Sequence, residues 1–144
     1  MSRGNVCYIH AMSRKRVGLI VVPPGVFVDI HEKRTVDLLA TKLGLDITFI
    51  MPNRQRGAKT PDIEMNGLAW EIKCPKGKSS RTLENNLRLA LQQSPYIIID
   101  LRRMDGRIPT AKLLQEIERR FSDAKTIRHI IAITRQEVLV DYRR

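Results

Sequence analysis

The stretch TPDIEMNGLAWEIKCPKGKSSRT, residues 60–82, is the part of the sequence from which the fold is most directly predicted. Its two apolar runs are separated by Asn66-Gly67. Asn-Gly is the strongest short signal for a tight turn that joins two antiparallel strands. Residues 62–73 are therefore predicted to form a β-hairpin, and the charged side chains of the stretch are placed on or beside it.

Alternation along the second strand of this hairpin puts Glu71 and Lys73 on one face, with Cα atoms roughly 7 Å apart. If the strands pair across the turn, Asp62 lies on the adjoining strand and its carboxylate converges with that of Glu71. Two carboxylates can hold one hard cation, and such oxygen ligands suit Mg²⁺, with Mn²⁺ as the alternative. That ion supports phosphodiester cleavage, in which Lys73 orients the attacking water or offsets charge that develops on the phosphate.

A second interpretation of the same residues is structural. An acidic and a basic residue two apart on a strand often form only a solvent-facing stripe, and this alternative stays open for Glu71 and Lys73. The Pro61-Asp62 pair, which is separated by eight residues from the EIK triplet, favours the metal-site interpretation over the solvent-facing stripe. Glu64 shares a strand face with Asp62 and is the competing candidate ligand.

Composition limits the class of protein. The chain has 144 residues, the length of one domain, with residues 1–21 as a weakly determined N-terminal segment and residues 22–140 as the core. Its 26 Lys and Arg against 15 Asp and Glu give a formal charge of +11, which favours polyanionic partners over a merely soluble basic protein or one that docks on anionic lipid. The early apolar run VGLIVV ends at Pro23-Pro24 and is too short to span a membrane. A soluble chain with reduced cysteines, acting in the cytoplasm, is expected.

The remaining elements are predicted from periodicity and from residues that begin or end a helix. Asp29 can cap a helix that ends before Gly44, and Ser80 can cap a second helix. A third helix is predicted over residues 108–121. Strands are predicted at residues 46–50, 96–101, 127–134 and 137–142, with two short ones in the N-terminal segment. The fold class is α/β, with a mixed central β-sheet flanked by helices.

The pair PD, eight residues and then EIK resembles the PD-(D/E)xK nuclease superfamily. The longer run TPDIEMNGLAWEIKCPKGKSSRTLENNLRLALQQSPYIIIDLRR, preceded by PPGVFVDIHEKRTVDLLATKLGLDITFI, resembles the C-terminal tRNA-nuclease domain of contact-dependent growth inhibition toxins and its free-standing relatives, over about residues 22–140. This resemblance implies a restriction-endonuclease-like core. It also implies Asp62 and Glu71 as metal ligands, Lys73 as the catalytic lysine, and Glu32 as an additional acidic member of the site.

Glu32 has two interpretations. It stands three residues after Asp29, where the acid of a capping box reaches back to the start of the helix. Its spacing also places it on the inward side of the helix, where an unpaired carboxylate is costly without a cation or donors. Cys74 is a departure from the similar pattern EIKSPKGKS, in which a small hydroxyl residue is expected, and a soft thiol is predicted to be a spectator beside a hard metal. His10, His31 and His129 are interpreted as packed or surface residues.

Basic residues that border the proposed site in the sequence are candidates for contact with nucleic acid. The predicted set is Lys76, Lys78, Arg81, Asn85 and Arg88. Aromatic residues make up only 5% of the chain, so recognition of a folded RNA by shape and backbone charge is favoured over stacking of single-stranded bases.

The function that these patterns favour is a metal-dependent endoribonuclease that cleaves tRNA, where the tRNA part rests on the resemblance. A DNA endonuclease of the same superfamily is the first alternative, because both polymers present the same phosphate. A non-catalytic basic module that binds RNA or a partner is the second. The toxin resemblance also implies an acidic immunity protein as a partner and a chain that is part of a delivered toxin.

Overall fold

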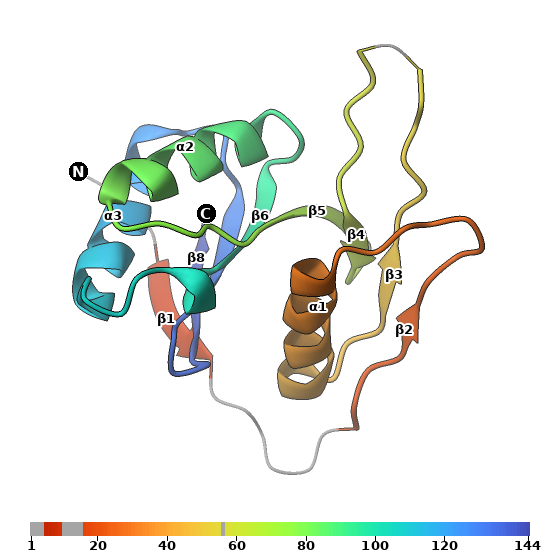
Figure 1. Cartoon of the computed structure of the whole chain (residues 1–144), viewed down its shortest axis with the longest axis horizontal. Coiled ribbons are helices and arrows are strands. Elements are labelled where there is room, and N and C mark those ends of the chain that lie inside the picture. The colour runs from red at the N-terminus through yellow and green to blue at the C-terminus, as the bar shows by residue number, and fades with distance from the viewer. Residues whose placement is uncertain (1–4, 10–15, 56) are drawn as a thin grey trace.

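The computed structural model describes residues 5–9, 16–55 and 57–144. These described residues contain three α-helices, α1 (Ile30–Leu43), α2 (Ser80–Leu91) and α3 (Thr110–Asp123), together with a short 3₁₀ turn η1 (Leu101–Arg103). The strands are β1 (Asn5–Ile9), β2 (Ile20–Val21), β3 (Ile47–Phe49), β4 (Ile63–Met65), β5 (Leu68–Lys73), β6 (Tyr96–Asp100), β7 (His129–Ile133) and β8 (Leu139–Arg143). Figure 1 shows their arrangement.

The strands form one mixed sheet in the order β1-β8-β7-β6-β5-β4-β3-β2. β5, β6 and β7 run parallel to one another, and β2 runs parallel to β3, while the other neighbours are antiparallel. The predicted α/β class with a mixed central sheet is confirmed. The predicted division into a segment 1–21 and a core 22–140 within one nuclease domain stays a prediction.

The hairpin of β4 and β5 forms as the sequence predicts. Asn66 and Gly67 both have positive φ angles, 54° and 76°, which is the backbone that a two-residue turn between twisted strands requires. Ile63 lies opposite Trp70 in the register, and the Asp62 N–H donates to the carbonyl of Trp70 at 3.0 Å. Asp62 therefore stands at the open end of the hairpin, beside Glu71.

α1 has the predicted ends. The Asp29 carboxylate accepts hydrogen bonds from the N–H groups of His31 and Glu32, and Gly44 ends the helix in the left-handed conformation at φ 66°. The prediction that Ser80 caps α2 is wrong by one residue. Ser79 occupies the cap position of α2 with no side-chain hydrogen bond to the helix, and Ser80 is already helical.

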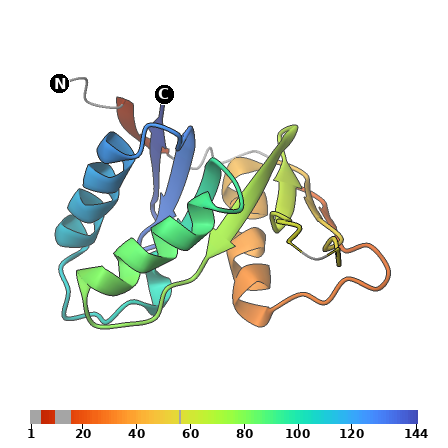
Figure 2. The same cartoon turned by 90° about the horizontal axis from the view of Figure 1, so that it is seen from above.

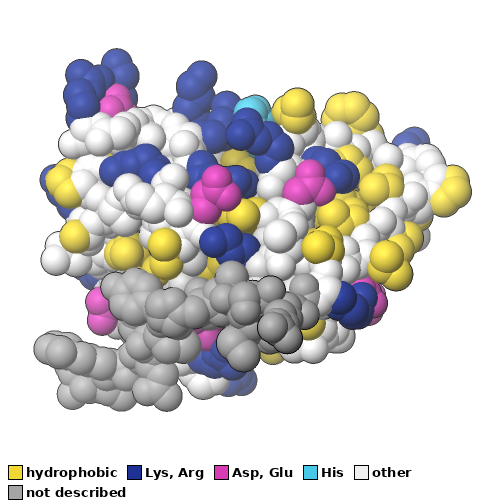
Figure 3. All heavy atoms as spheres, turned by 90° about the horizontal axis from the view of Figure 1, so that it is seen from below, with side chains coloured by type: hydrophobic (Ala, Val, Ile, Leu, Met, Phe, Trp, Pro, Cys, Tyr) yellow, Lys and Arg dark blue, Asp and Glu magenta, His cyan; other side chains and the backbone are white. Residues whose placement is uncertain are grey.

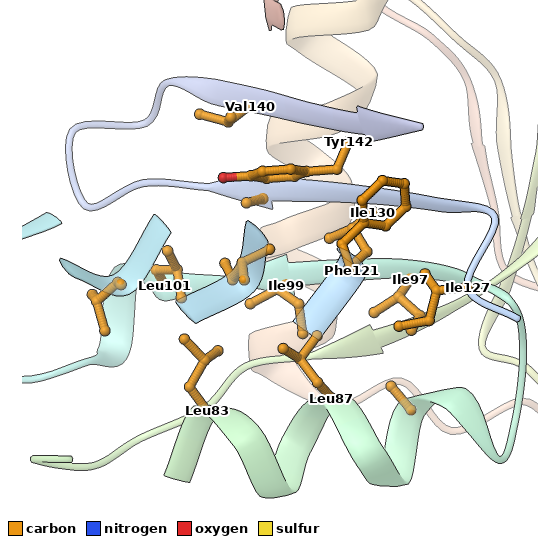
Figure 4. Close-up of a cluster of buried hydrophobic side chains, with 14 of the residues drawn as sticks. Leu83, Leu87, Ile97, Ile99, Leu101, Phe121, Ile127, Ile130, Val140 and Tyr142 are labelled. Carbon is orange, nitrogen blue, oxygen red and sulfur yellow. The ribbon is translucent and has the colours of Figure 1, made fainter. Parts of the chain in front are cut away.

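The helices cover opposite faces of the sheet, as Figure 2 shows, with α1 on one face and the α2–α3 pair on the other. Alternation along β6 divides the core in the same way, because Ile97 and Ile99 pack with α2 and α3 while Ile98 packs with α1. Figure 4 shows the cluster under α2 and α3, which includes Phe121 and Tyr142. Within the described residues, no helix is both long enough and apolar enough to cross a membrane.

Candidate active site

The hairpin fixes the position of the Asp62 carboxylate. Its Oδ2 atom accepts a hydrogen bond of 2.8 Å from the N–H of Ile72, so the side chain extends the ladder between the two strands. The backbone carbonyl of Asp62 accepts from the N–H of Ile50 at 2.9 Å, which also ties this position to the end of β3. Asp62 is thus held by two neighbouring strands, and its carboxylate lies against β5.

Glu71 and Lys73 meet on one face of β5, as alternation predicts. The Lys73 Nζ atom lies 3.3 Å from Glu71 Oε2, and the Glu71 side chain is only 7% exposed. Glu71 Oε1 is buried and has no hydrogen-bond partner among the residues that the structure describes. A purely solvent-facing stripe would leave both carboxylate oxygens in water, so the burial of Glu71 argues against that alternative.

The Glu71 carboxyl has a strongly perturbed pKa. Burial is the main cause, and the charge of Asp62 and a hydrogen bond to it add to the effect, so that the pKa rises to about 8 although the Lys73 ammonium opposes the rise. Two carboxylates that face each other disfavour ionisation of both. A cation between them removes this penalty.

Glu32 faces the same cluster from the first turn of α1. Burial and the charges of Asp62 and Asp29 raise its pKa to about 7, and Lys73 partly opposes the rise. The described residues contain no hydrogen bond from the Asp29 N–H to the Glu32 side chain, which a capping box requires. The structure therefore brings Glu32 toward Asp62 and Lys73 and leaves the start of α1 to the Asp29 cap alone.

The residues present fit a small hard cation bound by few protein ligands. The observation that carries this fit is Glu71 Oε1, a buried carboxylate oxygen that receives no hydrogen bond within the described part of the chain and lies beside the carboxylate of Asp62. Among the described residues, no group of three or more His, Cys, Asp and Glu side chains has the geometry to hold a metal ion. Mg²⁺ does not need such a group, because it is bound through one or two carboxylates and completes its shell with water and substrate phosphates.

The other predicted residues lie outside this cluster. Glu64, the competing candidate ligand, is exposed on β4. The five predicted nucleic-acid contacts are all exposed, two on the segment between β5 and α2 and three on the outer side of α2: Lys76, Lys78, Arg81, Asn85 and Arg88. Their exposure leaves them accessible to a polyanion, and their role stays a prediction.

A buried polar network lies beside the cluster, and the sequence patterns did not predict it. Thr35 on α1 donates a hydrogen bond of 2.6 Å to Asp100 Oδ2 at the end of β6, and its hydroxyl lies 3.4 Å from the Cys74 sulfur. Burial raises the pKa of the Cys74 thiol to about 11, so the thiol stays protonated at neutral pH. The sequence contains one indication of this network. Asp100 directly follows the three buried isoleucines 97–99, and a charged residue at the end of such an apolar run is unusual.

The histidines take no part in the cluster of Asp62, Glu71 and Lys73 as far as the described residues show. His129 contacts the buried carboxylate of Asp141, and its ring lies 4.9 Å from that of Trp70 in an edge-on arrangement. His31 is half-buried on the first turn of α1. His10 lies outside the described residues.

The family comparison covers the hairpin and most of the chain on its C-terminal side. The model of the contact-dependent growth inhibition CdiA C-terminal domain matches residues 59–138, more than half of the chain. The chain belongs to this family. The match begins just before Asp62 and includes Glu71, Lys73 and all five predicted nucleic-acid contacts, whereas Glu32 precedes it. Membership of the PD-(D/E)xK superfamily stays a prediction.

A solved structure has a similar fold. It is a CdiA-CT/CdiI toxin and immunity complex from Burkholderia pseudomallei, matched with a TM-score of 0.65 and 16% sequence identity over 88% of this chain and 100% of that one. At this identity the likeness concerns the fold. Among curated proteins, none matches the sequence.

Proposed function

We propose that this CdiA C-terminal domain is a metal-dependent endoribonuclease that cleaves tRNA. The single observation that carries the proposal is the half-buried cluster in which Asp62 and Lys73 meet the buried Glu71, one carboxylate oxygen of which has no hydrogen-bond partner among the described residues. The formal charge of +11 supports a polyanionic substrate. The choice of tRNA rests on the resemblance to tRNA-nuclease toxin domains.

The chain's own residues divide the work of hydrolysis. Asp62 and Glu71 would hold a divalent cation, Mg²⁺ or Mn²⁺, which when bound supplies Lewis-acid polarisation of a phosphate oxygen. The Lys73 ammonium, 3.3 Å from Glu71, can orient a water molecule and offset negative charge on the phosphate in the transition state. Glu32, with a pKa of about 7, can accept a proton from the attacking water.

The basic surface and the fold also suggest which protein binds this domain and in which cell it acts. A basic surface that binds nucleic acid attracts an acidic protein, so an acidic immunity protein that covers the site is proposed as the partner. The similar solved fold comes from a toxin and immunity complex, which supports this partner by analogy. The domain would then act in the cytoplasm of a target cell as the delivered part of a toxin.

One cleavage assay distinguishes this proposal from a DNA endonuclease and from a non-catalytic RNA-binding module. Purified protein is incubated with total RNA and with plasmid DNA, in Mg²⁺, Mn²⁺ or EDTA, and the products are separated on gels. The proposal predicts metal-dependent tRNA fragments from the parent protein and none from Lys73→Ala. The matched control is Lys125→Ala, which removes an exposed lysine on the loop after α3 and leaves cleavage unchanged.

Each alternative has its own signature in this assay. Cut plasmid with intact RNA would replace the proposal with a DNA endonuclease. Intact RNA and DNA at every metal, with binding of RNA retained in a gel-shift assay, would replace it with a non-catalytic RNA-binding module. Cleavage that persists in EDTA or in Lys73→Ala would reject the metal and lysine roles.

A further inference from the structure

A small cavity lies beside the carboxylate cluster, between the start of α1, the end of β5 and η1. Its volume is about 70 Å³. The residues that line it are His31, Arg34, Cys74, Asp100, Arg102 and Arg103. Six polar or charged side chains around so small a space are suited to a compact polar ligand.

The charges around the cavity do not cancel. Asp100 is neutralised locally, because Arg102 Nη2 lies 2.7 Å from its Oδ2 atom and Arg102 Nε lies 3.0 Å from its Oδ1 atom. Thr35 occupies Oδ2 as well, so the carboxylate of Asp100 is fully engaged. Within the described part of the chain, no carboxylate lies within ion-pair distance of Arg34 or Arg103. Arg34 and Arg103 therefore leave an excess of positive charge at the cavity, of which Glu137, whose Oε2 atom lies 4.0 Å from Arg102 Nη1, offsets a part.

The other residues of the lining do not oppose an anion. The Cys74 thiol is protonated at neutral pH, because burial raises its pKa to about 11, so it brings no negative charge. Among the described residues, Arg103 makes one long hydrogen bond, 3.5 Å from Nη1 to the carbonyl of Cys74, which keeps its planar guanidinium group near the cavity with most N–H groups free. Arginine forks match the oxygens of phosphate in geometry as well as in charge.

The position of the cavity relates it to the cluster. His31 and Cys74 line the cavity and are the chain neighbours of Glu32 and Lys73, and the charge of Glu32 acts on the Cys74 thiol, so the cavity lies near the acidic residues of the cluster. Arg34 and Arg102 also line a second hollow that continues along α1 with Asp37, Leu38 and Thr41. In Figure 3, Lys and Arg side chains lie beside a histidine near the upper edge of the view.

We propose that this cavity binds a phosphate group of the nucleic-acid backbone next to the one that is cleaved. The inference rests on the proposed nuclease function and adds a positioning site to it. Arg34 and Arg103 donate to the phosphate oxygens, while Thr35 holds Asp100 and Asp100 in turn holds Arg102 at the rim. A phosphate fixed here sets the register of the nucleic-acid strand, so that the neighbouring phosphodiester lies at Asp62 and Glu71.

Binding is measured without cleavage, in EDTA, by following the arginine Nε–H resonances in nuclear magnetic resonance spectra. One titration uses inorganic phosphate, and the others use a short RNA oligonucleotide with a terminal phosphate and the same oligonucleotide with hydroxyl ends. The variants are Arg34→Gln and Arg103→Gln. The matched control is Arg128→Gln, which changes an exposed arginine just before β7 whose backbone N–H donates to the carbonyl of Pro95, at the opposite end of β6 from Asp100.

The expected result is that phosphate shifts the resonances of Arg34 and Arg103 and that each of these variants weakens phosphate binding by about tenfold, whereas Arg128→Gln does not. Equal binding of both oligonucleotides identifies the internal phosphodiester as the ligand. A preference for the terminal phosphate, or for inorganic phosphate alone, overturns the backbone assignment. Equal weakening by Arg128→Gln, or no shift at either arginine, overturns the cavity as a site.

Cleavage assays separate this inference from the function on which it rests. Arg34→Gln and Arg103→Gln are expected to raise KM for tRNA about tenfold with a smaller change in kcat and an unchanged melting temperature. Full cleavage by both variants would reject the subsite and leave the nuclease standing. Phosphate binding in the cavity of a protein that cleaves no nucleic acid would reject the nuclease instead.

Discussion

The Glu71→Gln substitution tests the electrostatics of the site without any assay of activity. In the metal-free protein the Glu71 pKa of about 8 means that the folded state keeps a proton that the unfolded state releases above its ordinary pKa of 4.5. Stability therefore falls as pH rises through this window, by about 1.4 kcal/mol per pH unit for one such group. Between pH 5.5 and 7.5, ionisation of Glu71 alone lowers the free energy of unfolding by about 3 kcal/mol. For a chain of this size that corresponds to a fall of roughly 10 °C in Tm.

Glutamine has nearly the same shape as the protonated side chain and cannot ionise, so Glu71→Gln should lose this part of the pH dependence. Thermal unfolding is followed by circular dichroism in EDTA across the window. Glu64→Gln, which changes an exposed carboxylate on the same hairpin, is the matched control and should behave like the parent. Adding Mg²⁺ at pH 8 should raise Tm for the parent and not for Glu71→Gln. Parallel curves of Tm against pH for parent and Glu71→Gln would refute the reasoning.

Three further substitutions probe the other residues of the site and the turn that positions them. Lys73→Met should lower kcat for RNA cleavage by about 10²–10⁴-fold while Mg²⁺ affinity, measured by calorimetry, stays within a few fold, and loss of both together would assign Lys73 a structural role. Glu32→Gln should reduce cleavage at least about tenfold without lowering Tm in EDTA, whereas a lower Tm with normal cleavage would restore the capping role. Gly67→Ala should destabilise the fold by about 1 kcal/mol in urea unfolding, because φ is 76° at this turn, and an unchanged midpoint would contradict that turn geometry.

The hairpin and the ends of α1 could be predicted because their causes are local. Asn66-Gly67 encodes its own turn, and once the turn is fixed, alternation places Glu71 and Lys73 on one face of β5 and brings Asp62 beside them. Asp29 and Gly44 act within a few residues of the helix ends that they define. These short-range rules were enough to locate the candidate site without knowledge of the rest of the fold.

The features that the sequence did not predict depend on contacts between segments far apart in the chain. Thr35 and Asp100 are 65 residues apart, and nothing in the pattern of either segment indicates that a hydroxyl on α1 reaches the end of β6. The burial that raises the pKa values of Glu32 and Glu71 likewise comes from the assembled fold. The sequence places the cap of α2 one residue too late, because Ser79 and Ser80 carry the same capping group and only the folded structure shows which of them is helical.

Binding of one divalent cation by Asp62 and Glu71, beside Lys73, is the central claim. The most direct test is X-ray diffraction from crystals grown with Mn²⁺, measured where manganese scatters anomalously. We predict one anomalous peak within coordination distance of an oxygen of each carboxylate, and no peak there in Asp62→Asn crystals. No peak between these carboxylates in the parent protein, or a peak that persists in Asp62→Asn, would contradict the claim.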